Sequence, residues 1–135
     1  MRSAWIGVWI AFVLVSPAAA DTYPRQPGVD AIHYVFRLVL SDGRDEIEGE
    51  TTATFELRAA GVREIVLDLR TSTGAQGMTV ADVRSADQPL RFTHVANRLV
   101  ISLPTASTAG QRLTLDVRYR GVPASGLRIG PNKFG

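Results

Sequence analysis

The chain has only two histidines, the side chains that most often bind zinc or transfer protons near neutral pH. His33 is followed by Tyr34-Val35-Phe36-Arg37, and His94 is followed by Val95-Ala96-Asn97-Arg98. Neither segment has the glutamate and the second histidine of an H-E-x-x-H zinc motif. Because a zinc site needs three or four converging ligands, a structural role is the favoured interpretation of both histidines. We expect His33 on the polar side of its strand and His94 at the mouth of a hairpin.

Four glutamates at even-numbered positions suggest a calcium-binding or glycosidase surface. They are Glu46, Glu48, Glu50 and Glu56. Side chains two residues apart on a strand are separated by about 6.5–7 Å along a flat face, whereas a hard cation needs converging oxygens. A solvated sheet face or an interdomain contact is therefore the preferred interpretation. We expect these glutamates to pair across strands with Arg112, Arg118 and Arg120, each pair contributing about 0.2–1 kcal/mol.

Other catalytic chemistries lack the residues that they need. The 135 residues include no cysteine, which excludes disulfides, thiolate metal ligands and cysteine nucleophiles. The sequence has no G-x-S-x-G elbow and no phosphate-binding glycine loop. The net charge is only +2, and the basic residues are sparse and lack interleaved aromatics, which argues against nucleic-acid binding. The residues alone therefore assign no catalytic, cofactor-binding or metal-binding position.

The first 20 residues have the features of a secretory signal peptide. Arg2 supplies a positive charge, residues 6–15 form an apolar run, and Ala18-Ala19-Ala20 gives a small-x-small cleavage pattern. The apolar run is well short of the roughly 20 residues that a membrane-spanning helix needs. We expect cleavage before Asp21 and export. A small exported domain without cysteines favours the bacterial periplasm or the outside of the cell.

Without the signal peptide, 115 of the 135 residues remain, which is the length of one domain. The composition is 45% hydrophobic and 21% charged, so a folded chain is expected rather than a disordered one. We expect an extended lead-in over 21–30 and a β domain over 31–127. The Gly- and Pro-rich tail over 128–135 is expected to begin a missing downstream region.

The elements that must position these side chains are strands, because apolar residues recur with a period of two. The clearest run, over 46–58, alternates an apolar side with a charged one, so we expect one buried face and one wet face. Its expected inner residues are Ile47, Gly49, Thr51, Ala53, Phe55 and Leu57. The run before it, over 32–40, places Ile32, Tyr34, Phe36, Leu38 and Leu40 on one strongly apolar face.

Five further strands are expected over 64–70, 78–84, 90–94, 99–103 and 112–120, with a hairpin loop at 95–98. Outside the signal peptide no window of helical length shows an apolar period of 3.6 residues. About seven short strands at this spacing predict an all-β fold, namely a two-layer antiparallel β-sandwich or saddle-like sheet.

The order of several short motifs resembles the N-terminal β domain of the aminopeptidase N family of zinc metallopeptidases, over about residues 30–127. The motifs are Ile32-His33-Tyr34, Ile47-Glu48-Gly49-Glu50-Thr51, Val66-Leu67-Asp68-Leu69, Val80-Ala81-Asp82-Val83, Leu99-Val100-Ile101-Ser102-Leu103-Pro104, Ala109-Gly110-Gln111, Val117-Arg118-Tyr119-Arg120-Gly121-Val122-Pro123 and Gly126-Leu127. Each motif is weak alone, and their order and spacing make the resemblance.

The resemblance implies a noncatalytic role for this chain. In that family a saddle-like β domain precedes a thermolysin-like catalytic domain with H-E-x-x-H, a further glutamate ligand and a G-x-M-E-N segment, none of which occurs here. The β domain packs on the catalytic domain and helps to shape the pocket for the free amino end of a peptide. The Gln or Glu that it lends to this pocket is expected beyond Gly135. The implied partner is a metallopeptidase domain in cis or in trans, zinc belongs only to that domain, and the parent removes N-terminal residues from peptides.

An alternative from another class stays open. A freestanding exported β-sandwich that binds a protein or a glycan has the same composition and strand pattern, because sandwiches support many unrelated functions. The two hypotheses differ in what the gene encodes after Gly135. They also differ in whether the domain exposes a large apolar patch for docking.

Overall fold

The computed structural model describes residues 25–125 and 127. The expected signal peptide, residues 21–24 of the expected lead-in and the whole expected tail lie outside these residues. The described part consists of strands and loops, and it contains no helix long and apolar enough to cross a membrane. The strands are β1 (Val29–Ser41), β2 (Arg44–Leu57), β3 (Glu64–Asp68), β4 (Gly77–Ser85), β5 (Gln88–Pro89), β6 (Arg91–Val95), β7 (Arg98–Ser102) and β8 (Gln111–Val122).

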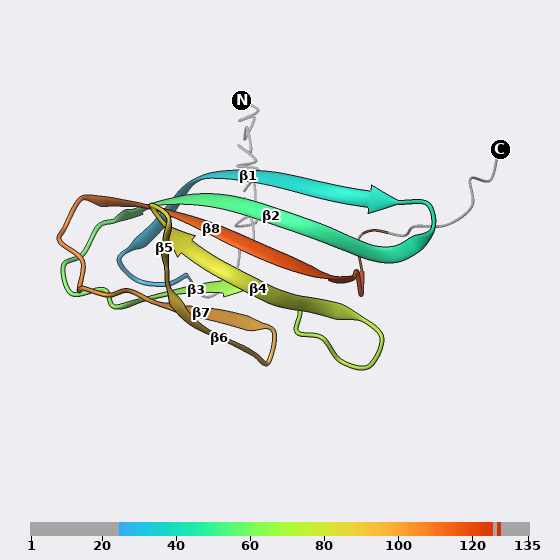
Figure 1. Cartoon of the computed structure of the whole chain (residues 1–135). Helices are drawn as coiled ribbons and strands as arrows, with labels where there is room; N and C mark the ends of the chain where they lie inside the picture. The colour runs from blue at the N-terminus through green and yellow to red at the C-terminus, as the bar shows by residue number, and fades with distance from the viewer. Residues whose placement is uncertain (1–24, 126, 128–135) are drawn as a thin grey trace, which may run out of the picture.

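The strands form two antiparallel sheets that pack as layers (Figure 1). Sheet A has the order β1-β2-β8-β4-β5, and sheet B has the order β3-β7-β6. The predicted all-β, two-layer antiparallel sandwich is therefore confirmed. The strand missed by the sequence pattern is β5, which has only two residues and is too short to show a period.

The core lies between the two sheets and follows the predicted alternation. In β2 the side chains of Ala53, Phe55 and Leu57 are at most 2% exposed, whereas the intervening Thr54 and Glu56 are half-buried. The core is completed by Leu90, between β5 and β6, and by residues of the other strands, namely Ile65, Val83, Leu99, Ile101, Leu115 and Val117. The inner and outer faces of β2 are those predicted from its sequence.

Three β-bulges interrupt the alternation. In β4 the register with β8 shifts between Val80 and Asp82, which explains why the inward residues Val80 and Val83 are three positions apart. In β1 the register with β2 shifts around Ile32 and again around Leu40. The part of β1 between these two bulges is a regular strand.

The chain passes from sheet A to sheet B at Leu90. β5 pairs with β4, and the next residue, Leu90, donates its backbone N–H to the carbonyl of Val83 at 2.8 Å. β6 then starts at Arg91 and pairs with β7. A single strand was expected over 90–94, and the structure places Leu90 at the crossing between the layers.

The predicted hairpin loop between β6 and β7 is confirmed. Ala96 and Asn97 have φ values of 50° and 63°, the left-handed pair of a two-residue type I′ turn. Asn97 also holds the turn to the segment after β3, because its Oδ1 accepts from the Thr71 N–H at 3.0 Å and its N–H donates to Thr71 Oγ1 at 2.8 Å.

Candidate interaction surface

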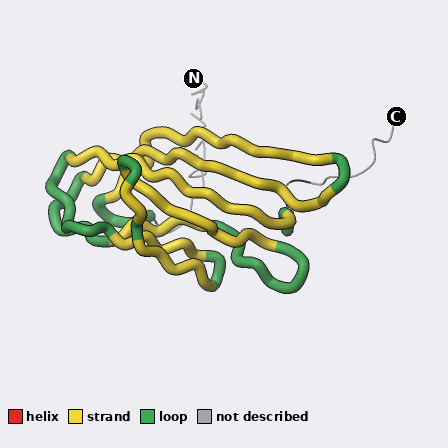
Figure 2. Tube along the Cα trace, viewed as in Figure 1, coloured by secondary structure: helices red, strands yellow, loops and turns green. Residues whose placement is uncertain are grey.

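Sheet B covers only one end of the inner face of sheet A. Its three strands have five residues each, whereas β1 and β2 have 13 and 14. At about 3.3 Å per residue, the short strands span roughly 17 Å and the long strands roughly 45 Å. The β1–β2 hairpin therefore projects beyond the second layer, as Figure 2 shows.

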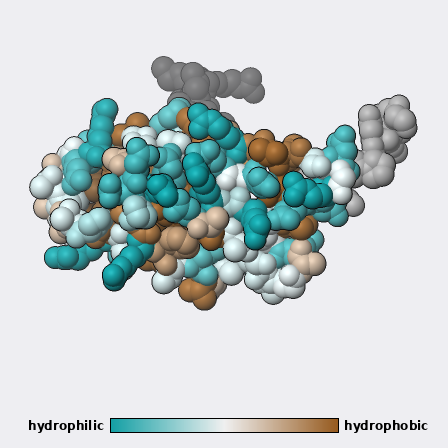
Figure 3. Space-filling model, viewed as in Figure 1, coloured by the Kyte–Doolittle hydropathy of each residue, from teal (hydrophilic) through white to brown (hydrophobic). Residues whose placement is uncertain are grey.

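Apolar side chains line the projecting part of β1. Tyr34, Phe36 and Leu38 pair with inner-face residues of β2, and their exposed fractions are 40%, 63% and 48%. Ile32 and Leu40, at the two bulges, are similarly exposed. Hydrophobic atoms gather along β1 in Figure 3. We call Tyr34, Phe36 and Leu38 the β1 apolar row; it is the apolar face expected from the sequence, and it lies largely open to solvent.

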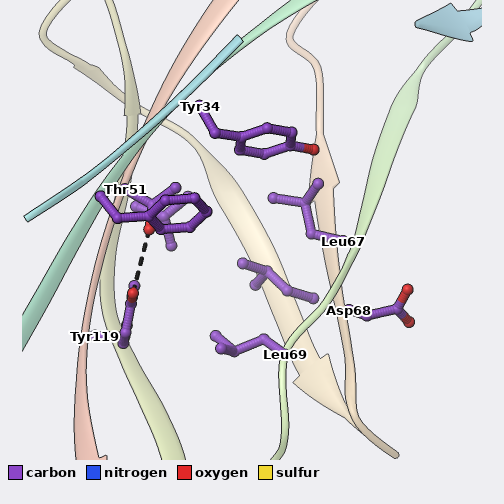
Figure 4. A pocket seen from close by; sticks show the side chains of 9 residues that line it. Tyr34, Thr51, Leu67, Asp68, Leu69 and Tyr119 are labelled. Carbon is purple, nitrogen blue, oxygen red and sulfur yellow. Dashed lines mark hydrogen bonds between the residues drawn. The ribbon is translucent and has the colours of Figure 1, made fainter. Parts of the chain in front are cut away.

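A cleft of about 340 Å³ lies between two residues of the β1 apolar row, Tyr34 and Phe36, and sheet B (Figure 4). Its labelled lining residues are Tyr34, Thr51, Leu67, Asp68, Leu69 and Tyr119. The lining is mostly apolar, and its hydroxyl groups are partly paired, since Thr51 Oγ1 and the Tyr119 hydroxyl lie 3.2 Å apart in a hydrogen bond. This arrangement suits contact with apolar side chains.

Aromatic contacts fix Tyr34 at the mouth of this cleft. Its ring stacks on Phe36, with centroids 5.8 Å apart and an interplanar angle of 9°, and meets Phe55 edge-on at 6.1 Å. Burial raises the pKa of the Tyr34 phenol above its usual value. Tyr34 is therefore neutral near pH 7 and presents a hydroxyl donor toward Leu67 across the cleft (Figure 4).

Gly49 lets Tyr119 lie flat against β2. The two residues are direct cross-strand partners, and a Cβ on Gly49 would lie 2.3 Å from Tyr119 Cε2. Only a residue without a side chain leaves room for the ring here. The ring in turn covers the glycine and brings its hydroxyl to Thr51.

The outer face of sheet A carries the predicted charge pairs. Two of the predicted glutamates form ion pairs across strands, Glu50 with Arg118 (3.9 Å) and Glu46 with Arg120 (3.9 Å), while Glu48 pairs with Arg44 of its own strand (3.8 Å). Arg112 lies opposite Glu56 in the register of β2 and β8. The expected cross-strand pairing is confirmed for Arg118 and Arg120. Exposed pairs of this kind contribute about 0–1 kcal/mol each, so this face is held by main-chain pairing rather than by its charges.

The two histidines lie on different sheets. His33 is on the outer face of β1, exposed and opposite Thr54. His94 is half-buried in β6, and its Nε2 lies 2.9 Å from the carbonyl oxygen of Leu69. This contact gives His94 the structural role expected for it. In residues 25–125 and 127, no three His, Asp or Glu side chains form a group that could hold a metal ion.

Sequence reasoning missed Gln26, which lies in the expected extended lead-in. Its Nε2 donates to the carbonyl of Glu64 at 2.7 Å, and its Oε1 accepts from the N–H of Val66 at 3.0 Å. The amide thus pairs with the edge of β3 as the peptide group of another strand would. A polar residue beside Pro27 gives no sequence signal for this contact.

Comparison of this fold with solved structures finds M1 zinc metallopeptidases. A mutant from Deinococcus radiodurans bound to a Tyr-Ser-Ala substrate is 29% identical, with a TM-score of 0.61, over 73% of this chain and 21% of that chain. A second mutant structure from this organism is 31% identical, with a TM-score of 0.62, over 79% of this chain and 24% of that chain. A two-domain M1 zinc metallopeptidase mutant bound to L-arginine is 30% identical, with a TM-score of 0.62, over 75% and 22%.

This chain therefore spans between a fifth and a quarter of the length of these metallopeptidases. No protein-family model and no curated protein matches it. The likeness combines about 30% identity with a shared fold over nearly three quarters of the chain or more. The chain thus resembles one part of the M1 zinc metallopeptidases, as the order of its sequence motifs predicted.

Proposed function

We propose that this chain is the noncatalytic N-terminal β domain of an exported zinc aminopeptidase. In this proposal it docks its uncovered inner face on a metallopeptidase domain and helps to shape the pocket for the free amino end of a peptide. The observation that supports it is the exposure of the β1 apolar row. The domain that carries this row matches about a fifth of the length of an M1 zinc metallopeptidase.

The inner face is the better docking surface on physical grounds. A sheet buries its apolar face against a second layer, and sheet B supplies that layer over only one end of sheet A. Covering the β1 apolar row would remove apolar surface from water at little polar cost. Covering the outer face would desolvate a row of alternating charges, formed in strand order by Arg37, Glu50, Arg118 and Asp82.

The chemistry of the proposed parent belongs to the partner domain. There a zinc ion would polarise the scissile carbonyl and activate a water molecule, and the parent would remove N-terminal residues from peptides. No described residue of this chain is given a part in those steps. Export to the periplasm or the cell exterior, after cleavage before Asp21, belongs to the same proposal and is tested by the N-terminal sequence of the secreted protein.

The first experiment determines the codons that follow Gly135. A reading frame that continues to an H-E-x-x-H motif and a later glutamate supports the proposal. A stop codon overturns it and leaves the freestanding binding module for a protein or a glycan.

The second experiment measures binding between this chain and the downstream polypeptide by titration calorimetry. The double variant Phe36→Ser/Leu38→Ser removes two half-exposed apolar side chains from the inner face. Its matched control, Val35→Ser/Val39→Ser, changes two apolar residues of the same strand on the outer face. Half of the usual burial gain for two such side chains is about 1.5–3 kcal/mol, so we expect at least a roughly ten-fold loss of affinity for the inner pair alone. Equal losses in both variants would contradict docking through the inner face.

A further inference from the structure

Among the described residues, β1 is the longest of the sheet edges and has no short length or side-chain cover to protect it. β5 and β6 end their sheets with two and five residues, and the edge of β3 is bonded by the amide of Gln26. β1 has 13 residues, and among residues 25–125 and 127 its only strand partner is β2. A long edge strand with free N–H and C=O groups is a template for another strand unless charges, prolines or a cover block it.

The open edge has a regular central segment. Between the two bulges, β1 pairs with β2 without interruption from His33 to Val39. These seven residues include no proline, glycine or lysine, and the one side chain that is always charged is that of Arg37. The segment therefore carries a single permanent charge and no proline, and the two bulges lie at its ends rather than within it.

One antiparallel register pairs the whole segment with a second copy and keeps its positive charges apart. A two-fold axis at Phe36, the middle of the segment, would pair all seven residues and place Arg37 opposite Val35 of a second copy. Moving the axis to Val35 would place Arg37 opposite His33, and moving it to Arg37 would oppose two arginines. Like charges directly opposite one another destabilise a sheet, so the register centred on Phe36 is favoured.

We propose that two copies of this chain associate through β1, antiparallel and about a two-fold axis at Phe36, so that their five-stranded sheets form one continuous sheet. Such an interface is isologous, because each copy contributes the same edge. On the inner face Tyr34 of one copy meets Leu38 of the other, and the two Phe36 rings are neighbours. The proposal rests on the main-chain edge of β1, whereas the docking function rests on the side chains of its inner face, so the outer-face position Val35 tests the edge alone.

The register can be tested by placing a charge at Val35, which lies on the outer face and would face Arg37 of the second copy. Val35→Glu would place a carboxylate opposite Arg37 of the second copy, and Val35→Lys would place an ammonium there. The two-fold axis makes each contact twice, so two cross-strand pairs should tighten or weaken dimerisation by roughly two- to thirty-fold. Thr114→Glu and Thr114→Lys are the matched controls, since Thr114 is exposed on the outer face of the interior strand β8.

The measurement is sedimentation equilibrium over a wide range of protein concentration, on the chain from Asp21 to Gly135, which contains every described strand and the whole core. Unfolding in urea first shows that each variant is folded. We expect a monomer–dimer equilibrium that Val35→Glu strengthens and Val35→Lys weakens, with both Thr114 variants like the parent. We also expect slower hydrogen exchange in residues 33–39 at high concentration. A chain that stays monomeric, a dimer that responds equally to both Val35 variants, or one that Val35→Glu weakens would overturn the proposal.

Discussion

Replacing Gly49 with alanine should have opposite effects on stability in two backgrounds. In the parent chain the new methyl group would lie 2.3 Å from Tyr119 Cε2, so the ring must move. Overpacking of this kind costs about 1–3 kcal/mol, and the displaced hydroxyl would lose a bond to Thr51 worth about 1 kcal/mol. Against this, alanine in a strand gains about 0.5–1 kcal/mol over glycine. Because Tyr119 is only half-buried and its ring can move, we expect a net loss of about 1–2 kcal/mol.

In a Tyr119→Ala background the obstructing ring is absent, and only the backbone term remains. Gly49→Ala should then stabilise the domain by about 0.5–1 kcal/mol relative to Tyr119→Ala alone. The coupling between the two sites is thus about 1.5–3 kcal/mol, which a double-mutant cycle resolves. Urea unfolding, monitored by far-ultraviolet circular dichroism, gives the free energies of unfolding of the parent chain, the two single variants and the double variant. Destabilisation by Gly49→Ala in both backgrounds would refute the argument that the Tyr119 ring is the obstacle.

Three further predictions concern the core, a turn and a titration. Phe55→Ala should lower the free energy of unfolding by about 3–5 kcal/mol, while the neighbouring Glu56→Ala should change it by no more than about 0.5 kcal/mol; equal effects in urea unfolding would contradict the assignment of faces in β2. Ala96→Asn should stabilise the hairpin by roughly 0.5–1 kcal/mol, measured as a rise in melting temperature, because alanine is strained at a φ of 50° and asparagine tolerates it. Burial raises the pKa of Tyr34 in the folded state. The neutral phenol therefore contributes stability that is fully present below the pKa of the unfolded chain, about 10, and that is lost as the pH rises through the pKa of the folded chain. Tyr34→Phe should therefore lose less stability than the parent chain above about pH 10, measured as the free energy of unfolding in urea. An identical fall in both proteins would count against this role of Tyr34.

The strand pattern of the domain was predictable because one face of nearly every strand is apolar. The alternation in β2 gave the correct inner residues, including Ala53 and Phe55, since a period of two has only two phases. Bulges and layer changes break this rule locally. The three-residue step from Val80 to Val83 and the crossing at Leu90 depend on pairing between distant strands, which a local pattern does not contain.

The sequence predicted that the β1 apolar row is apolar, but it did not predict that the row is exposed to solvent. The alternation from Ile32 to Leu40 showed an apolar face, but the length of the opposite layer decides how much of that face is covered. Nor does any local signal show that Gln26 bonds to β3 or that Gly49 makes room for Tyr119. Both contacts join residues 38 or more positions apart, and only the tertiary fold brings them together.

The position of β8 in sheet A determines when this domain can fold during synthesis. β8 lies between β2 and β4 and is the last of the described strands to be synthesised. Without residues 111–122, sheet A is left in two parts, the β1–β2 hairpin and β4 with β5, whereas all strands of sheet B lie within residues 64–102. Sheet A is therefore completed only when β8 inserts between β2 and β4, which makes the pairing of this layer the least local step in folding of the described domain.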